Sequence, residues 1–254
     1  MFPVRRACLI VCCILVCLFT TPLPATAQSF TVLTNSVPPF KFLKEGDPSG
    51  IAGDLLTYLF RATGHSVAKT RIVSMTQFLE QGYTEPDTVF LSLSKRHQQG
   101  HSFKWVGPIT AAKSGIIVKK SRHLRLARIR DARQLTLASV IGSAPEKMLM
   151  GTALKEKQFL RFPTPDGAIQ ALADDKADGL LLATSAAYHL MARKGLDPAR
   201  FETALTLDSI PLYFAFHTAT PDRVIDQLQT ALDAMKRPDR TGMSPYLKIL
   251  SAYY

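Results

Sequence analysis

Strand-like and helix-like segments alternate along almost the whole sequence from residue 30 onward. Short apolar or β-branched runs predict strands at Phe30–Thr34, Leu135–Ile141, Phe159–Phe162, Gly179–Ala183 and Ile210–His217. Apolar residues at helical spacing predict helices at 51–62, 144–154, 166–173, 185–193, 221–235 and 245–253. Repeated β-α-β order is typical of an α/β fold with a mostly parallel sheet. An all-helical or all-β fold is therefore excluded.

Two local signals mark where helices begin and end. Gly64 stands where a helix C-terminus favours glycine. Ser143 is followed three residues later by Glu146, which is the pattern of a capping box, so we expect a helix from there through Leu154. The free backbone N–H groups at Gly142 and Ser143 would suit a carboxylate or another anion; the alternative is a helix cap alone.

Two extended apolar segments differ from the other predicted strands because each follows an irregular stretch. They are Gly115–Lys119 and Ile210–Phe214. If they are paired crossing strands, the chain between them forms a second lobe and the C-terminal helices return to the first. We expect lobe 1 to comprise residues 28–116 and 212–254, and lobe 2 residues 117–211. Two lobes with two connections imply a cleft that opens and closes about a hinge.

The first 27 residues have the pattern of a secretory signal peptide. Arg5 and Arg6 precede thirteen uncharged residues, and the segment ends in an A-x-A sequence at Ala27. A transmembrane anchor would need about 20 apolar residues, more than this run has. A lipoprotein signal would use Cys17, but Val16 before it is not small. We expect cleavage after Ala27 and a periplasmic protein.

Removal of this segment changes the cysteine content and the charge. All 4 cysteines lie within it, so the exported chain would have no disulfide, no thiolate nucleophile and no cysteine-bound metal. Its formal charge falls from +11 to +9, because two of the 31 basic residues are lost and all 20 acidic ones stay. Export argues against a nucleic-acid partner and favours anionic solutes or anionic lipid surfaces.

The sequence contains none of the common catalytic motifs of serine hydrolases, zinc proteases, P-loop proteins or dinucleotide-binding enzymes. His97 and His101 could share a metal, but a glycine between them weakens a helix there. Asp174, Asp175 and Asp178 could act as a catalytic cluster or as ordinary turn residues, and we expect the latter. We therefore expect no metal, no cofactor and no enzymatic activity.

A dense basic run follows the first crossing segment. It comprises Lys119, Lys120, Arg122, Arg125, Arg128, Arg130 and Arg133. Such a run is either a solvated face or a patch for anionic headgroups or an acidic docking partner.

Six short motifs, in this order and spacing, resemble the family 3 extracytoplasmic solute-binding proteins of the polar amino-acid type. They are Val37–Phe40, Gly50–Leu56, Phe103–Ile109, Gly115–Lys120, Ala171-Leu172 with Ala177-Asp178, and Tyr213–Phe216. The resemblance spans residues 30 to about 250. It implies a two-lobed type II periplasmic-binding-protein fold with two hinge strands and a small solute held between the lobes. It also implies a monomer that serves an inner-membrane ABC permease or a sensor receptor.

The resemblance also indicates where ligand groups would lie. The family's carboxylate-binding arginine falls on Gln99, or on Arg96 if three residues are inserted in the loop before Pro108. The lobe-two aspartate that binds the α-ammonium falls on Ala183, and an acidic group after the first strand is replaced by Asn35. A closed cleft without these carboxylates would leave an ammonium unpaired. We therefore expect a small polar or anionic, amino-acid-like solute that is captured for an ABC importer.

We therefore predict a periplasmic solute-binding protein with a defined set of ligand-binding residues. Phe40 is expected as an aromatic wall or a core residue, Arg96 as an anion clamp, and Gly142 with Ser143 as an anchor on lobe 2. Additional hydrogen-bonding groups are expected from Asn35, Thr184 and Gln99. The alternatives are a ligand-dependent sensor that docks on a membrane receptor, and a dehydratase-like enzyme on the same fold. The enzyme would need a general acid or base, and the sequence has no obvious pair.

Overall fold

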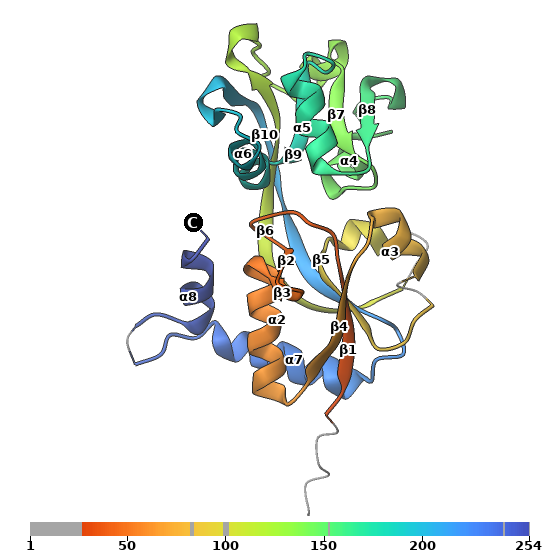
Figure 1. The fold of residues 1–254 in the computed structure, drawn as a ribbon, viewed down its shortest axis with the longest axis vertical. Helices are drawn as coiled ribbons and strands as arrows, with labels where there is room; N and C mark the ends of the chain where they lie inside the picture. Colours follow the sequence, from red (N-terminus) through yellow and green to blue (C-terminus); the bar gives the residue numbers. More distant parts are fainter. Residues whose placement is uncertain (1–26, 82–83, 99–101, 152, 241, 254) are drawn as a thin grey trace, which may run out of the picture.

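The computed structural model describes residues 27–81, 84–98, 102–151, 153–240 and 242–253. They form two lobes, one above the other, joined by a pair of long strands (Figure 1). No helix within these ranges is long and apolar enough to cross a bilayer. The predicted signal peptide lies outside the described residues, except for Ala27.

One eight-stranded sheet continues through both lobes, in the order β4-β1-β5-β10-β6-β9-β7-β8. Lobe 1 contains β1 (Ser29–Thr34), β4 (Ser66–Ile72) and β5 (Thr88–Leu93), and lobe 2 contains β7 (Leu137–Val140), β8 (Phe159–Phe162) and β9 (Gly179–Ala183). The strands within each lobe pair in parallel. The predicted α/β class with a mostly parallel sheet is confirmed.

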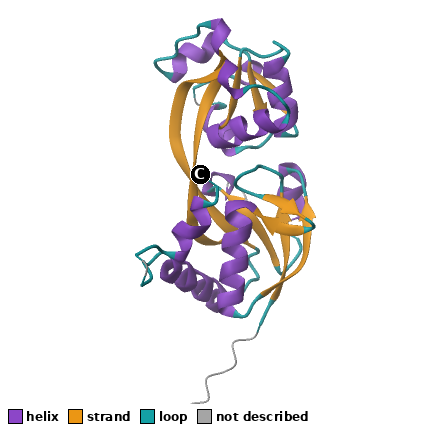
Figure 2. Ribbon diagram, turned by 60° about the vertical axis from the view of Figure 1, so that its left-hand side comes forward, coloured by secondary structure: helices purple, strands orange, loops and turns teal. Residues whose placement is uncertain are grey.

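The two lobes are connected by β6 (Lys104–Lys119) and β10 (Phe201–Phe216), each 16 residues long. They pair antiparallel along nearly their full length (Figure 2). Crossing strands are thus present where the sequence predicted them, although both are much longer than the predicted segments. The predicted lobe boundaries at 116/117 and 211/212 fall inside these strands.

Helices cover the sheet in lobe 1. They are α2 (Gly50–Thr63), α3 (Met75–Gln81), α7 (Asp222–Met235) and α8 (Pro245–Ser251), and a small hairpin is formed by β2 (Phe42–Lys44) and β3 (Asp47–Ser49). As predicted, α2 ends at Gly64, whose φ of 77° is left-handed and whose N–H donates to Phe60 O. The buried faces of α2 and α7 pack with Phe30 and Phe216 of the sheet in one core.

Lobe 2 has shorter helices and two apolar cores, one on each side of its strands. The helices are α4 (Ala144–Leu149), α5 (Pro165–Ala173) and α6 (Thr184–Arg193). The prediction that α4 runs through Leu154 is wrong. Met150 has extended φ and ψ angles and Gly151 has a φ of 77°, so the helix cannot continue. Single 3-10 turns lie at Lys95–Gln98, Lys120–Arg122, Ile129–Gln134, Glu156–Gln158 and Pro198–Arg200.

Candidate functional site

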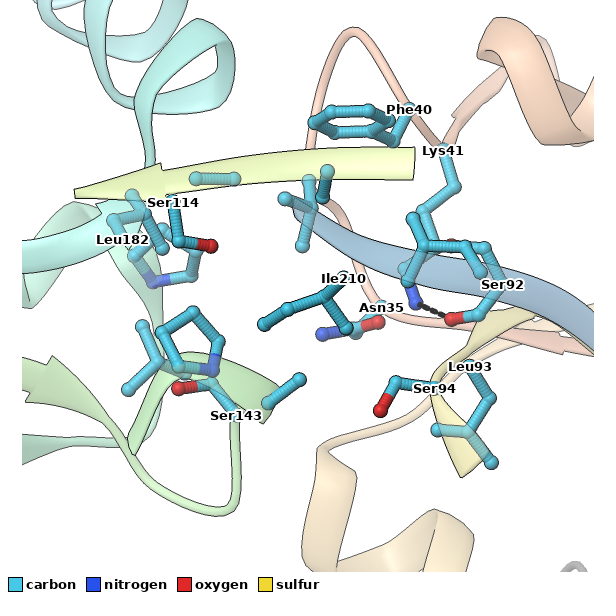
Figure 3. A pocket seen from close by; sticks show the side chains of 18 of the residues that line it. Asn35, Phe40, Lys41, Ser92, Leu93, Ser94, Ser114, Ser143, Leu182 and Ile210 are labelled. Carbon is cyan, nitrogen blue, oxygen red and sulfur yellow. Dashed lines mark hydrogen bonds between the residues drawn. The ribbon is translucent and has the colours of Figure 1, made fainter. Parts of the chain in front are cut away.

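A pocket with a cavity volume of about 100 Å³, partly open to solvent, lies between the two lobes. Lobe 1, lobe 2 and both crossing strands contribute to its wall (Figure 3). Its polar lining residues are Asn35, Lys41, Ser92, Ser94, Ser114 and Ser143. The remaining described wall is apolar or proline, and no described lining residue is an aspartate or glutamate.

The loop after β1 brings Phe40 and Lys41 to this pocket. The backbone N–H groups of Val37 and Lys41 donate to each other's carbonyl oxygens, which closes the loop before β2. Phe40 is 3% exposed; it lines the pocket and also belongs to the lobe 1 core. Lys41 Nζ donates to Ser92 O at 2.6 Å and lies 4.1 Å from the ring centroid of Phe90.

Lys41 is a buried cation, with only 5% of its surface exposed. It forms no salt bridge with any described carboxylate. Burial removes the ammonium from water and lowers the pKa of Lys41 from 10.5 to about 7. An anion in the pocket would supply the charge that the surrounding protein does not.

Two further polar groups of the pocket have no partner among the described residues. Asn35 Oδ1 and Ser114 Oγ are both buried and form no hydrogen bond within the described chain. Asn35 follows the end of β1, while Ser114 lies in β6 at the crossing. A buried unpaired polar atom costs free energy, so a ligand that bonds to it recovers that cost.

The Gly142-Ser143 corner lies at the lobe 2 side of the pocket, but its backbone N–H groups are already used. Gly142 N donates to Glu146 Oε2 at 2.7 Å, and Ser143 N donates to Val140 O at 3.0 Å. Ser143 Oγ accepts a long hydrogen bond from Glu146 N at 3.4 Å. Ser143 lines the pocket as expected and caps α4; Gly142 is not a lining residue.

The acid at this corner is held by its own network. Glu146 is 2% exposed, and Ser139 Oγ donates to its Oε1 at 2.7 Å. Arg161 donates from Nε to Oε1 at 2.9 Å and from Nη2 to Oε2 at 3.2 Å. The hydrogen bonds to Glu146 raise the pKa of Arg161. The corner therefore holds an anion that belongs to the protein.

Arg96 and Thr184, two of the other predicted ligand residues, do not line the pocket. The side chain of Arg96 is exposed on the 3-10 turn Lys95–Gln98 and is not among the residues that line the pocket. Thr184 begins α6, and its Oγ1 donates to Lys113 O at 3.1 Å. Neither residue is among those that line the pocket. Gln99 lies outside the described residues.

The structure also bears on the two histidines considered as metal ligands, His97 and His101, and on the three aspartates considered as a catalytic cluster. His101 lies outside the described residues, so the pair with His97 is not described. Within the described ranges, no three His, Cys, Asp or Glu side chains gather as a metal site. The three aspartates between α5 and β9 do not line the pocket.

The basic run is partly neutralised by that same acidic turn. Lys119 Nζ lies 2.7 Å from Asp175 Oδ2, and Arg122 Nη2 lies 2.7 Å from Asp178 Oδ1. The ion pairs join the end of β6 to the loop before β9. The first part of the run therefore has a structural role within lobe 2.

The lobes touch at one rim of the pocket. A Cβ atom built on Gly142 would lie 3.1 Å from Met75 Cγ of lobe 1. Residues of α4 also lie against the 3-10 turn that follows β5. The structure thus has the lobes in contact while the pocket remains partly open.

Sequence reasoning missed Lys41, which is the charged residue most closely tied to the pocket. One signal was available: Lys41 stands between Phe40 and Phe42, directly after two prolines. An extended chain places neighbouring side chains on opposite faces. A lysine between two phenylalanines can therefore point to a cleft while one phenylalanine enters the core.

The fold resembles solved structures along most of the chain. A histidine kinase sensor domain with similarity to periplasmic binding proteins gives a TM-score of 0.76 at 16% identity, covering 89% of this chain and 95% of that one. A mutant of ArgBP from T. maritima gives 0.72 at 18%, covering 89% and 94%. The ancestral amino acid-binding protein AncCDT-1, a precursor of cyclohexadienyl dehydratase, gives 0.68 at 18%, covering 89% and 95%. No family model matches the sequence, and no curated protein matches it.

Proposed function

We propose that this chain is an extracytoplasmic solute-binding protein that captures a small polar or anionic solute between its lobes. The chain has the two-lobed fold of periplasmic binding proteins. The observation that carries the proposal is the pocket itself, because its wall is built from both lobes across the paired β6 and β10. A solute that contacts both walls favours the closed arrangement, since only differential affinity shifts such an equilibrium.

The neighbouring structures support a binding role more than a catalytic one. Most of them are amino-acid binding proteins, and one is a precursor of a dehydratase. Among the described lining residues, Lys41 is the titratable side chain. A dehydratase would need a second group to return the proton that the first removes. The signal-peptide pattern before Gln28 agrees with an extracytoplasmic location.

A ligand screen followed by a test of closure examines this function. The chain is exported, purified from the periplasm and heated with amino acids, organic acids, amines, sugars and short peptides. A solute at 100 times its dissociation constant stabilises the chain by about 2.7 kcal/mol. The same solute should reduce the radius of gyration in X-ray scattering. If no class of compound stabilises the chain, the proposal is contradicted.

A sensor role is the second candidate, and the similarity to a histidine kinase sensor domain favours it. A solute-loaded chain would then bind a membrane receptor instead of delivering the solute to an ABC permease. Crosslinking in membranes, with and without the solute found above, separates the two. Solute-dependent capture of a kinase supports sensing, while capture of a permease supports transport.

A further inference from the structure

We infer that Lys41 anchors the carboxylate of the solute, and that the solute is a small monocarboxylate with an apolar body and no ammonium group. This inference rests on the proposed function and assigns the chemical class that the cleft would take. It moves the anion-binding role from Arg96, which is exposed outside the pocket, to a residue buried within it.

The geometry around Lys41 favours an anion. Lys41 Nζ has one hydrogen bond, to Ser92 O, and an ammonium has three protons to donate. The ring of Phe90 stabilises the cation but does not neutralise it. A carboxylate can accept the remaining protons and complete the charge pair in a desolvated site.

The same inventory favours a solute with a single negative charge and no ammonium. Lys41 is the basic side chain among the described lining residues, so a second carboxylate would have no buried cation. An ammonium would need an acid, and none of the described lining residues is Asp or Glu. A charge left unpaired in a closed cleft is strongly unfavourable.

The rest of the wall defines the body of the solute. Phe40, Met75, Val140, Leu182, Ile210 and Leu212 present apolar surface to the pocket. They come from lobe 1, lobe 2 and β10, so an apolar body would contact both sides. The hydroxyl of Ser114 can donate to the solute in addition to Lys41. A branched-aliphatic or aromatic acid matches this combination.

Matched probes test the inference by calorimetry on the exported chain near pH 6.5. The acids 3-phenylpropanoate and 4-methylpentanoate are compared with phenylalanine and leucine, which add only the α-ammonium, and with the corresponding neutral amides. We expect at least one acid to bind about tenfold or more tightly than both its amino acid and its amide. Lys41→Met should lose this preference for the acid while still binding the amide, which shows that its pocket is intact.

Lys44→Met is the matched control, because Lys44 is exposed in the same hairpin and does not line the pocket. It should bind the acid as the native chain does. If Lys41→Met does not fold, Lys41→Gln replaces it. The inference is overturned if the amino acid binds as well as the acid, if loss of Lys41 leaves the acid-to-amide ratio unchanged, or if no acid binds. If a compound of another class binds, the proposed function stands and only the monocarboxylate inference fails. If no compound in the whole screen binds, both the proposed function and the inference fail.

Discussion

The two lobes each place one buried charge beside the cleft, and they treat it in opposite ways. Glu146 of lobe 2 and Lys41 of lobe 1 are 2% and 5% exposed. Glu146 accepts hydrogen bonds from Ser139, Gly142 and Arg161. Lys41 has one carbonyl partner and no described counter-charge. Similar burial therefore does not mean similar function. A buried charge that the protein itself pairs is structural, whereas a buried charge without a counter-charge is available to a ligand.

The energetic consequence differs accordingly. The Glu146 network offsets much of the desolvation cost through charge-assisted hydrogen bonds. Lys41 retains that cost in the free chain, which is why burial lowers its pKa to about 7. Lobe 1 therefore gives up stability at the cleft, and a bound anion would return it.

The largest expected effect is on the pH dependence of stability. The folded pKa of Lys41, about 7, lies below its ordinary value of 10.5. Between these values the unfolded chain binds more protons, so this residue makes stability rise with pH, and its full penalty is present below the folded pKa. Lys41→Met should be more stable than the native chain near pH 6, by roughly 5 kcal/mol at most. Urea unfolding at several pH values measures this.

The difference between the two chains should disappear above the ordinary lysine pKa, where Lys41 is neutral in both states. Lys44→Met controls for the loss of a positive charge, and its stability should follow the native chain at every pH. If Lys41→Met is less stable than the native chain near pH 6, Lys41 is a structural residue and the contrast with Glu146 fails.

The second effect comes from removing the cation that pairs with Glu146. Arg161→Ala would leave Glu146 buried without its cation, which costs about 3 kcal/mol in comparable buried pairs. We expect this loss in urea unfolding, with acid-probe affinity changed far less than by Lys41→Met. Lys155→Ala is a matched control, because it also removes a lobe 2 cation but one that forms no salt bridge to Glu146. A larger loss of affinity than of stability would place Glu146 in the ligand site.

These contrasts also show what the sequence could predict. The strands Phe159–Phe162 and Gly179–Ala183 have the predicted bounds because each is a short run with flanking turn signals. The crossing strands were recognised only in part, since β6 mixes proline, glycine and polar residues along Lys104–Ser114. Their length comes from pairing with each other, which no local pattern contains.

The site was predictable only where position along the chain determines it. Asn35, Phe40 and Ser143 line the pocket because each stands at a strand end or a helix start, where the chain meets the cleft. Arg96 was predicted from the family resemblance with three inserted residues, yet its side chain is exposed and is not among the residues that line the pocket. Lys41 was missed because the burial of a lysine depends on Phe90 and Ser92, about 50 residues away in the sequence.

The third effect concerns the rim where the lobes touch. Gly142 has a φ of 71°, and an added Cβ would lie 3.1 Å from Met75 Cγ. Gly142→Ala therefore costs about 1–2 kcal/mol through the left-handed backbone alone. The added Cβ should also displace the Met75 side chain by a few tenths of an ångström. Urea unfolding should show a slightly larger loss than for the control Gly151→Ala, whose φ of 77° carries similar strain with no atom within 4 Å of the added Cβ.

The smallest effect is expected from Ser114. Its hydroxyl is a neutral group without a partner among the described residues, and it is compared with the charged Lys41 in the same cleft. Ser114 Oγ is buried without a partner, so Ser114→Ala removes a desolvated hydroxyl and should stabilise the free chain by about 1 kcal/mol. If the hydroxyl bonds to the solute, the same variant should bind the acid probe several-fold more weakly. Thermal unfolding and calorimetry measure the two changes separately. A variant that is more stable and binds equally well would show that the Ser114 hydroxyl takes no part in recognition of the solute.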